Sequence, residues 1–238
     1  MSSLRVEGTR DPRDEHVQRL RKWGEQAVLA GVSLGAIAGF SALAAAIVND
    51  RDVSFDRSLV GLMGRGRRPV GDAIARGFTF FGGPIGATAV ALGALALTRR
   101  RPLFAAQVSI GAVGGIIAEV IMKRFFLRKR PTLLAHLEKV SSTSFPSGHS
   151  MAAASLYLTL AFVAGRSQRM HGHRVALLGG ASALASVIGA TRVYLGVHWP
   201  TDVLGGLTLG TAWACATEAV FDFGADKTTA PALVGAGV

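Results

Sequence analysis

The sequence predicts an all-α, polytopic membrane protein built as a six-transmembrane helix bundle. Half of its 238 residues are hydrophobic, and the mean hydropathy is +0.38. Only 17% of the residues are charged, whereas a soluble domain carries about a quarter. The charged residues are also bunched between long apolar stretches, which is expected where a bilayer penalises buried charge. Composition and charge patterning therefore argue against an ordinary soluble core.

Six apolar stretches approach the roughly 20 residues that a helix needs to cross the hydrocarbon of a bilayer. The first, Gln26–Asn49, contains no ionisable side chain. The other five spans are expected at Phe78–Thr98, Pro102–Met122, His149–Gly165, Val175–Ala190 and Val203–Phe221. Glycine and alanine are frequent in these stretches, which suits close contact between helices in a membrane.

The remaining segments divide the chain further. Residues 1–25 are polar and of mixed charge, and we expect a cytoplasmic N-terminal segment there and not a cleavable signal peptide. Residues 50–76 mix apolar and basic side chains, which fits a short amphipathic helix on the membrane surface or a solvated connector. The Ala/Gly/Thr-rich residues 223–238 are expected to be a disordered tail. We expect residues 26–222 to form the membrane domain that contains all six spans.

The net charge of +11 raises the question of a nucleic-acid partner. The arginines border apolar segments, as in Arg99–Arg101 and Arg166–Arg174, where they can meet anionic lipid headgroups. No nucleic-acid-binding motif is present, so we expect the bilayer, and no nucleic acid or obligatory protein partner. The single cysteine, Cys215, lies in an apolar run and leaves no intrachain disulfide.

Three short segments carry the polar chemistry: residues 123–131 (KRFFLRKRP), 146–149 (PSGH) and 191–202 (TRVYLGVHWPTD). They follow the third and fifth expected spans and lead into the fourth and sixth. Six spans therefore place all three segments on the same side of the membrane. Polar groups gathered beside membrane spans indicate a functional site.

The cations of these segments suit a phosphate group. Phosphoryl transfer depends largely on positioning the phosphate and neutralising its charge, and Lys123, Arg130 and Arg192 can do both. Pro131 disfavours helix at Arg130, so this arginine is expected in a turn. Taken singly, Lys123 and Arg130 also fit ordinary interfacial charges. Glu119 lies one helical turn before Lys123; it could steer the ammonium, but we favour a simple interfacial charge.

The PSGH segment predicts the start of a helix. Ser147 is a good N-cap residue, and the free backbone N–H groups near Gly148 and His149 would form an anion site. Gly148 would let the backbone approach the anion closely. An ordinary capped helix start explains Ser147 equally well, although it does not explain the histidine.

The third segment supplies a candidate nucleophile. Pro200 suits a first helical turn, so the Asp202 carboxylate can reach back to Nδ1–H of His198. Nε2 of His198 would then be free to attack phosphorus and form a phosphohistidine. His149, when protonated, would donate to the leaving oxygen and later take a proton from water. His198 alone would also fit a membrane-edge histidine beside Trp199.

The order and spacing of these residues resemble the type 2 phosphatidic acid phosphatase superfamily, over about Phe78 to Phe221. The pattern is Lys, six residues, Arg-Pro; then PSGH; then Arg, five residues, His, three residues, Asp. Thr191 departs from the serine usual in the family but keeps the hydroxyl. The resemblance implies phosphate binding by Lys123, Arg130, Ser147, Gly148 and Arg192, and catalysis by His149 as general acid, His198 as nucleophile and Asp202 as its orienting carboxylate.

The resemblance also implies an enzyme without metal or cofactor, with its site on the extracytoplasmic side of the cell membrane and both termini in the cytoplasm. We expect an integral-membrane lipid phosphatase whose substrate is a polyprenyl diphosphate such as undecaprenyl diphosphate, phosphatidylglycerol phosphate or phosphatidic acid. The Ala/Gly/Arg-rich composition looks bacterial and favours the polyprenyl lipid. The alternatives are a phosphotransferase that uses the same phosphohistidine and an inactive lipid-binding or transport protein. A vanadium haloperoxidase is disfavoured because those relatives are soluble.

Overall fold

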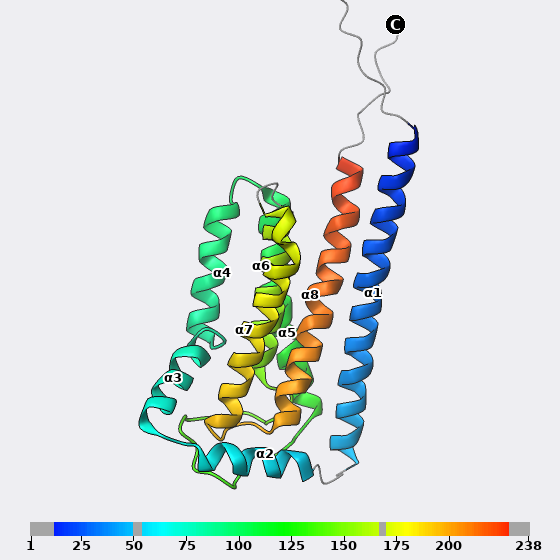
Figure 1. Ribbon diagram of the computed structural model, residues 1–238. Helices are drawn as coiled ribbons and strands as arrows, with labels where there is room; N and C mark the ends of the chain where they lie inside the picture. The colour runs from blue at the N-terminus through cyan, green and yellow to red at the C-terminus, as the bar shows by residue number, and fades with distance from the viewer. Residues whose placement is uncertain (1–11, 50–53, 167–169, 229–238) are drawn as a thin grey trace, which may run out of the picture.

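The computed structural model describes residues 12–49, 54–166 and 170–228, and their regular structure is entirely helical (Figure 1). The helices are α1 (Pro12–Val48), α2 (Ser54–Arg65), α3 (Pro69–Phe80), α4 (Pro84–Thr98), α5 (Pro102–Phe125), α6 (Gly148–Gly165), α7 (Arg174–Tyr194) and α8 (Pro200–Thr228), with a short 3₁₀ turn at His171–His173. The long helices run side by side, and α2 crosses one end of the bundle.

Five of these helices, α1, α5, α6, α7 and α8, are long and apolar enough to cross a membrane, and the bent pair α3 and α4 brings the number to six if it crosses as one span. The all-α, six-span prediction is confirmed. The expected second span, Phe78–Thr98, is wrong in form, because α3 and α4 meet at an angle of 46°. The chain breaks at Gly82-Gly83-Pro84, where Pro84 opens α4 and cannot continue the hydrogen bonding of α3.

Three expected boundaries also change. Helix α1 begins at Pro12, so most of the predicted N-terminal segment, residues 1–25, continues the first span. Helix α8 runs to Thr228, past the start of the predicted tail at residue 223; residues 229–238 lie outside the described residues. Within residues 50–76, α2 is an amphipathic helix and not a solvated connector, because Val60 is buried while Arg57 and Arg65 are exposed.

Helix α6 lies at the centre of the bundle and packs against α5, α7 and α8, while α1 packs along α8. Small residues allow α6 and α8 to touch closely. A Cβ atom on Gly206 would lie 2.4 Å from the carbonyl oxygen of Ser147, and one on Gly210 would lie 2.6 Å from that of Met151. These glycines, one turn apart on α8, hold the start of α8 against the start of α6, where the polar segments lie.

Replacing Gly206 with alanine is expected to destabilise the protein by about 1–3 kcal/mol, because the added methyl group overlaps backbone that cannot move aside cheaply. The unfolding temperature in detergent, followed by circular dichroism, measures the effect. Gly180→Ala on α7 is the matched control, since a Cβ there meets nothing within 4 Å. Equal unfolding temperatures for the two variants would contradict this account of the contact between α6 and α8.

A buried polar cluster joins the helices at the opposite end of the bundle. The carboxylate of Glu218, 1% exposed, accepts hydrogen bonds from Gln107 and Arg166, both at 2.7 Å, and from Arg174 at 3.3 Å. The expectation that Arg166 and Arg174 face lipid headgroups is therefore corrected: both side chains turn inward to a buried acid. Three arginine and glutamine donors compensate a charge that would otherwise be costly to bury.

Candidate active site

The three predicted motif segments meet at the end of the bundle that α2 crosses (Figure 1). Backbone hydrogen bonds join them: Ser147 N–H donates to the carbonyl oxygen of Asp202 at 3.0 Å, and Leu137 N–H donates to that of Leu195 at 3.0 Å. The connection between α5 and α6 is thereby fixed to the connection between α7 and α8. The prediction that the motifs share one side of the bundle is confirmed.

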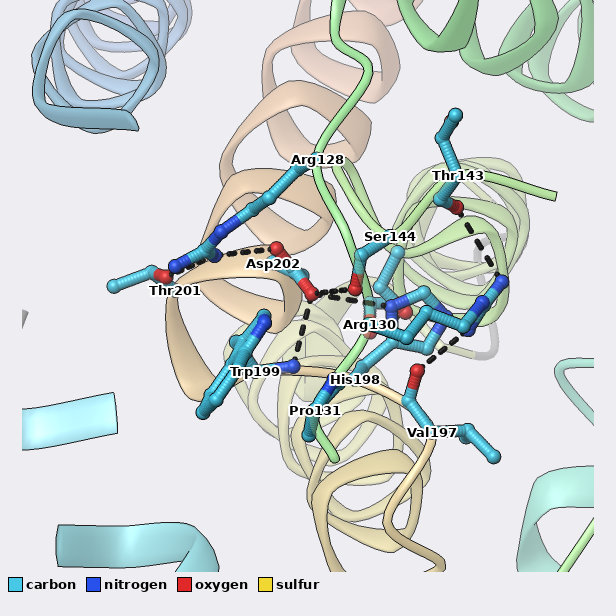
Figure 2. Close-up of polar contacts among 12 residues, drawn as sticks. Arg128, Arg130, Pro131, Thr143, Ser144, Val197, His198, Trp199, Thr201 and Asp202 are labelled. Carbon is cyan, nitrogen blue, oxygen red and sulfur yellow. Dashed lines mark hydrogen bonds and ion pairs between the residues drawn. The ribbon is translucent and has the colours of Figure 1, made fainter. Parts of the chain in front are cut away.

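His198 is 2% exposed and lies between a cation and a carboxylate (Figure 2). Its Nε2 is 3.1 Å from Nη1 of Arg130, and its Nδ1 is 3.4 Å from Oδ2 of Asp202. A guanidinium can only donate hydrogen bonds, so Nε2 must accept and the ring hydrogen is on Nδ1. This neutral tautomer has its basic nitrogen, Nε2, directed toward Arg130, one of the cations predicted to bind phosphate.

Asp202 is held on both carboxylate oxygens. Oδ1 accepts from Arg128 at 2.6 Å, while Oδ2 accepts from the backbone N–H of Trp199 at 2.8 Å and from the hydroxyl of Ser144. The Trp199 contact is local, since a carboxylate in the first turn of a helix commonly reaches back to the N–H group of the capping residue. Asp202 and His198 are thus brought together as predicted.

Burial lowers the pKa of His198 to about 4, the contacts with Asp202 oppose this shift, and the charges of Arg130 and Arg192 add to it. The imidazole is therefore neutral at physiological pH, as a nucleophile must be. Burial and the neighbouring Arg192 also lower the pKa of Arg130, while Asp202 opposes this shift.

Protonation of His198 removes the lone pair on Nε2 that attacks phosphorus. Because kcat/KM reports the pKa values of groups in the free enzyme, we expect its acid limb near pH 4, the pKa of His198, and not near 6.5. Activity should therefore fall as the pH drops through about 4. A phosphomonoester itself titrates near pH 6, so its ionisation is measured by phosphorus NMR and divided out of the profile. A corrected limb at the ordinary histidine pKa would contradict the tautomer and burial described above.

The predicted cations border a common space but are already paired with protein groups. Lys123 Nζ is 2.8 Å from Glu119 Oε1, so Glu119 contacts the predicted site and is more than an interfacial charge. Arg192, 2% exposed, donates through Nη1 to Thr79 at 2.7 Å and to Glu138. Its Nε is buried without a hydrogen-bond partner.

The PSGH segment forms the start of α6 as predicted, with Ser147 at the cap position. The hydroxyl of Ser147 does not cap the helix; it accepts a hydrogen bond from Ser150 at 2.9 Å. Gly148 packs so closely on Glu119 that a Cβ atom would lie 2.2 Å from Oε1. His149 lies against the break between α3 and α4, because a Cβ on Gly83 would be 3.2 Å from its Nε2.

A cavity of about 500 Å³ opens onto these groups. Its polar end is lined by Lys123, Arg130, Gly148, His149, Arg192 and His198, together with Glu119 and Glu138. Ser147 does not line it. Its walls are apolar and come from three helices: Ala91, Leu92 and Leu95 of α4, Val108, Ala112, Val113 and Ile116 of α5, and Ala152 and Leu156 of α6. The cavity therefore combines a cationic end with an apolar channel between helices.

Sequence reasoning missed several residues that hold the site. These are Asp56, Thr79, Arg128, Glu138 and Ser144. His136, which lies outside the motifs, is exposed, and its Nε2 lies 2.7 Å from the carbonyl oxygen of Pro131. Within the described residues, no group of three or more His, Cys, Asp or Glu side chains is placed to bind a metal ion.

The comparisons with known proteins agree with this geometry. The PAP2 superfamily model matches residues 102–223, which contain all three motif segments. The chain belongs to the PAP2 superfamily. This confirms the resemblance to the type 2 phosphatidic acid phosphatases on which the sequence interpretation rested.

Named PAP2 relatives are phosphatases. Phosphatidylglycerophosphatase B of Bacillus subtilis is 44% identical over 91 residues, 38% of this chain and 44% of that protein. Decaprenylphosphoryl-5-phosphoribose phosphatase of Mycobacterium tuberculosis is 32% identical over 64% of this chain and 82% of its own length. The chain thus aligns with less than half of the first relative and most of the second.

The fold is also that of a solved PAP2 enzyme. The crystal structure of a transmembrane PAP2 type phosphatidylglycerolphosphate phosphatase from Bacillus subtilis matches with a TM-score of 0.73 and 27% sequence identity. The match covers 85% of this chain and 98% of that chain. The predicted multi-pass membrane protein of the PAP2 superfamily is confirmed.

Proposed function

We propose that this protein is an integral-membrane lipid phosphatase that works through a phosphohistidine on His198. The cavity carries the proposal: one end presents a neutral imidazole among cations, and the walls are apolar side chains of α4, α5 and α6. A lipid with a phosphorylated headgroup has the same division into an anionic end and an apolar tail.

The phosphate would bind among Lys123, Arg130 and Arg192. Arginine offers paired N–H donors that match phosphate oxygens, and the buried Nε of Arg192 still lacks a partner. Glu138 now occupies Nη1 of Arg192, so the phosphate would exchange with this carboxylate. The backbone at Gly148 adds the N-terminal end of α6, where free N–H groups attract anions.

The chemistry then follows from the two histidines. Nε2 of His198 attacks phosphorus in line, the bond from phosphorus to the lipid oxygen breaks, and His149 donates a proton to that oxygen. Asp202 stabilises the imidazolium that forms on His198. In the second step His149 takes a proton from water, the hydroxide attacks the phosphohistidine, and inorganic phosphate leaves as His198 becomes neutral again.

We favour a polyprenyl-linked phosphate or diphosphate as substrate, with phosphatidylglycerol phosphate and phosphatidic acid as the other candidates. The M. tuberculosis relative, which aligns over 82% of its length, is named for a decaprenyl lipid. We also propose that the site faces away from the cytoplasm and that both termini are cytoplasmic. The start of α1 and the end of α8 lie together at the end of the bundle opposite the site (Figure 1), which supports this arrangement.

The experiment is a phosphate-release assay on the purified protein in detergent with EDTA present, using undecaprenyl diphosphate, phosphatidylglycerol phosphate and phosphatidic acid in parallel. We expect release from at least one lipid, highest for the polyprenyl substrate, and unchanged by EDTA. If phosphate were released from none of the three lipids, the proposed phosphatase activity would be refuted. Loss of activity with EDTA, restored by a divalent cation, would refute the expected metal independence.

A further inference from the structure

Arg128 bridges two acidic side chains that come from different helices. Its Nη1 donates to Oδ1 of Asp202 at 2.6 Å and to Thr201 Oγ1 at 2.7 Å, and its Nη2 donates to Oδ2 of Asp56 at 2.7 Å. Figure 2 shows the guanidinium against Thr201 and Asp202, on the side of Asp202 away from His198. Arg128 itself lies in the connection after α5, so one side chain joins this connection to α2 and α8.

Asp56 is the partner that fixes Arg128. It lies in the first turn of α2, is 2% exposed, and accepts from the backbone N–H of Thr201 at 2.9 Å and from the Thr201 hydroxyl at 2.6 Å. An acid buried to this extent is retained only where donors compensate it. The donors here belong to Arg128 and to the first turn of α8, which also carries Asp202.

The bridge determines how Asp202 faces His198. The contact from Oδ2 to Nδ1 of His198, at 3.4 Å, is longer than the 2.6 Å contact from Oδ1 to Arg128 and the 2.8 Å contact to the Trp199 N–H. The carboxylate is therefore oriented mainly by groups other than the histidine. Without Arg128, Oδ1 would lose its donor, and only the Trp199 N–H and the Ser144 hydroxyl on Oδ2 would oppose rotation about the terminal torsion, which is soft for aspartate.

We propose that Arg128 and Asp56 are positioning residues that keep the Asp202 carboxylate, and through it the reactive tautomer of His198, in place. This inference rests on the proposed phosphohistidine chemistry for its effect on rate. It makes α2, a helix outside the predicted motifs, part of the support of the nucleophile. The order of action is Asp56 on Arg128, Arg128 on Asp202, and Asp202 on His198.

Two readouts test the proposal. The first is NMR of the full-length protein in detergent with ¹⁵N-labelled histidine, with the His198 signals assigned by their loss in His198→Ala. Wild type is expected to show a protonated Nδ1 and an unprotonated Nε2. In Arg128→Gln the contact with Arg130 still favours this form, but the less firmly held Asp202 is expected to admit the other tautomer, so that the spectrum shows a mixture with a measurable minor form. The second is kinetics: Arg128→Gln should lower kcat by about 10- to 100-fold, as misplacement of a reacting group does, with KM within about two-fold.

A double-mutant cycle tests the order of action. Asp56→Asn alone should lower kcat, but it should add less than about two-fold in the Arg128→Gln background, because residues acting through one another are not additive. Lys129→Gln is the matched control for Arg128, since it removes the adjacent, exposed cation. Asp72→Asn is the control for Asp56, because this α3 carboxylate accepts from Tyr194 at 2.9 Å and not from Arg128.

The outcomes separate this proposal from the proposed function. An unchanged tautomer and unchanged kcat in Arg128→Gln, or equal losses in Lys129→Gln, would overturn the positioning role even if the wild type is an active phosphatase. A tautomer mixture in Arg128→Gln would support it even if the wild type released phosphate from no lipid. Should Arg128→Gln not fold, Arg128→Lys keeps the charge but cannot bridge both acids, and the same mixture and kcat loss are expected.

Discussion

Replacing His198 with alanine is expected to lower kcat for phosphate release by at least about 10⁴-fold, the scale of loss seen when a covalent nucleophile is removed. His198 is the residue whose free nitrogen, Nε2, faces the cationic end of the cavity. No other described imidazole combines burial, a carboxylate on Nδ1 and contact with Arg130. The measurement is single-turnover phosphate release from the preferred lipid.

A second measurement makes the test specific. Wild type quenched in alkali during turnover should retain phosphate on histidine, whereas His198→Ala should retain none. His136→Ala is the control, because His136 is exposed and contacts the carbonyl oxygen of Pro131. If His198→Ala kept more than about a tenth of the wild-type rate, a loss far too small for a nucleophile, the assignment would be wrong.

Replacing His149 with alanine is expected to lower the rate on lipid substrates by about 10²- to 10⁴-fold, the usual contribution of general acid catalysis. The loss should depend on the leaving group. A lipid alkoxide leaves poorly without a proton, whereas nitrophenolate needs none, so p-nitrophenyl phosphate should be affected far less. The ratio of the two losses distinguishes proton donation from phosphate binding.

His173→Ala serves as the control for this variant, since His173 is exposed and lies at the start of α7, at the other end of the bundle. Equal losses on the lipid and on p-nitrophenyl phosphate would mean that His149 binds phosphate or shapes the cavity. In that case the first proton would have to come from another group.

The sequence was sufficient to predict that His198 and Asp202 lie together, because their contact is local. His198 and Asp202 are four residues apart on either side of Pro200, so a helix start brings them together whatever the rest of the chain does. The spans followed from uncharged length alone. Given six spans, the three motifs must lie on one side of the membrane, because they follow odd-numbered spans and precede even-numbered ones. In the structure they lie at one end of the bundle.

The supporting residues were not predictable because their partners are distant along the chain. Arg128 is one of five cations in residues 123–131, and nothing local distinguishes it from Lys129, which is exposed. Asp56 contacts Thr201 and Arg128 only through tertiary packing. Glu138 lies in an irregular connection without a periodic pattern. The sequence Gly82-Gly83-Pro84 indicates a break in the second span, but these residues do not interrupt the apolar stretch, so hydropathy alone does not detect the break.

The bend between α3 and α4 has a consequence for how substrate is encountered. At about 1.5 Å per residue, the 15 residues of α4 extend only about 22 Å, less than the roughly 30 Å of hydrocarbon in a bilayer. Gly82, Gly83 and Pro84, at the break, line the cavity beside His149. For the lipid substrate proposed above, this break is the expected place of entry from the bilayer. We then expect the rate to depend on the mole fraction of substrate in the membrane, and not on its bulk concentration.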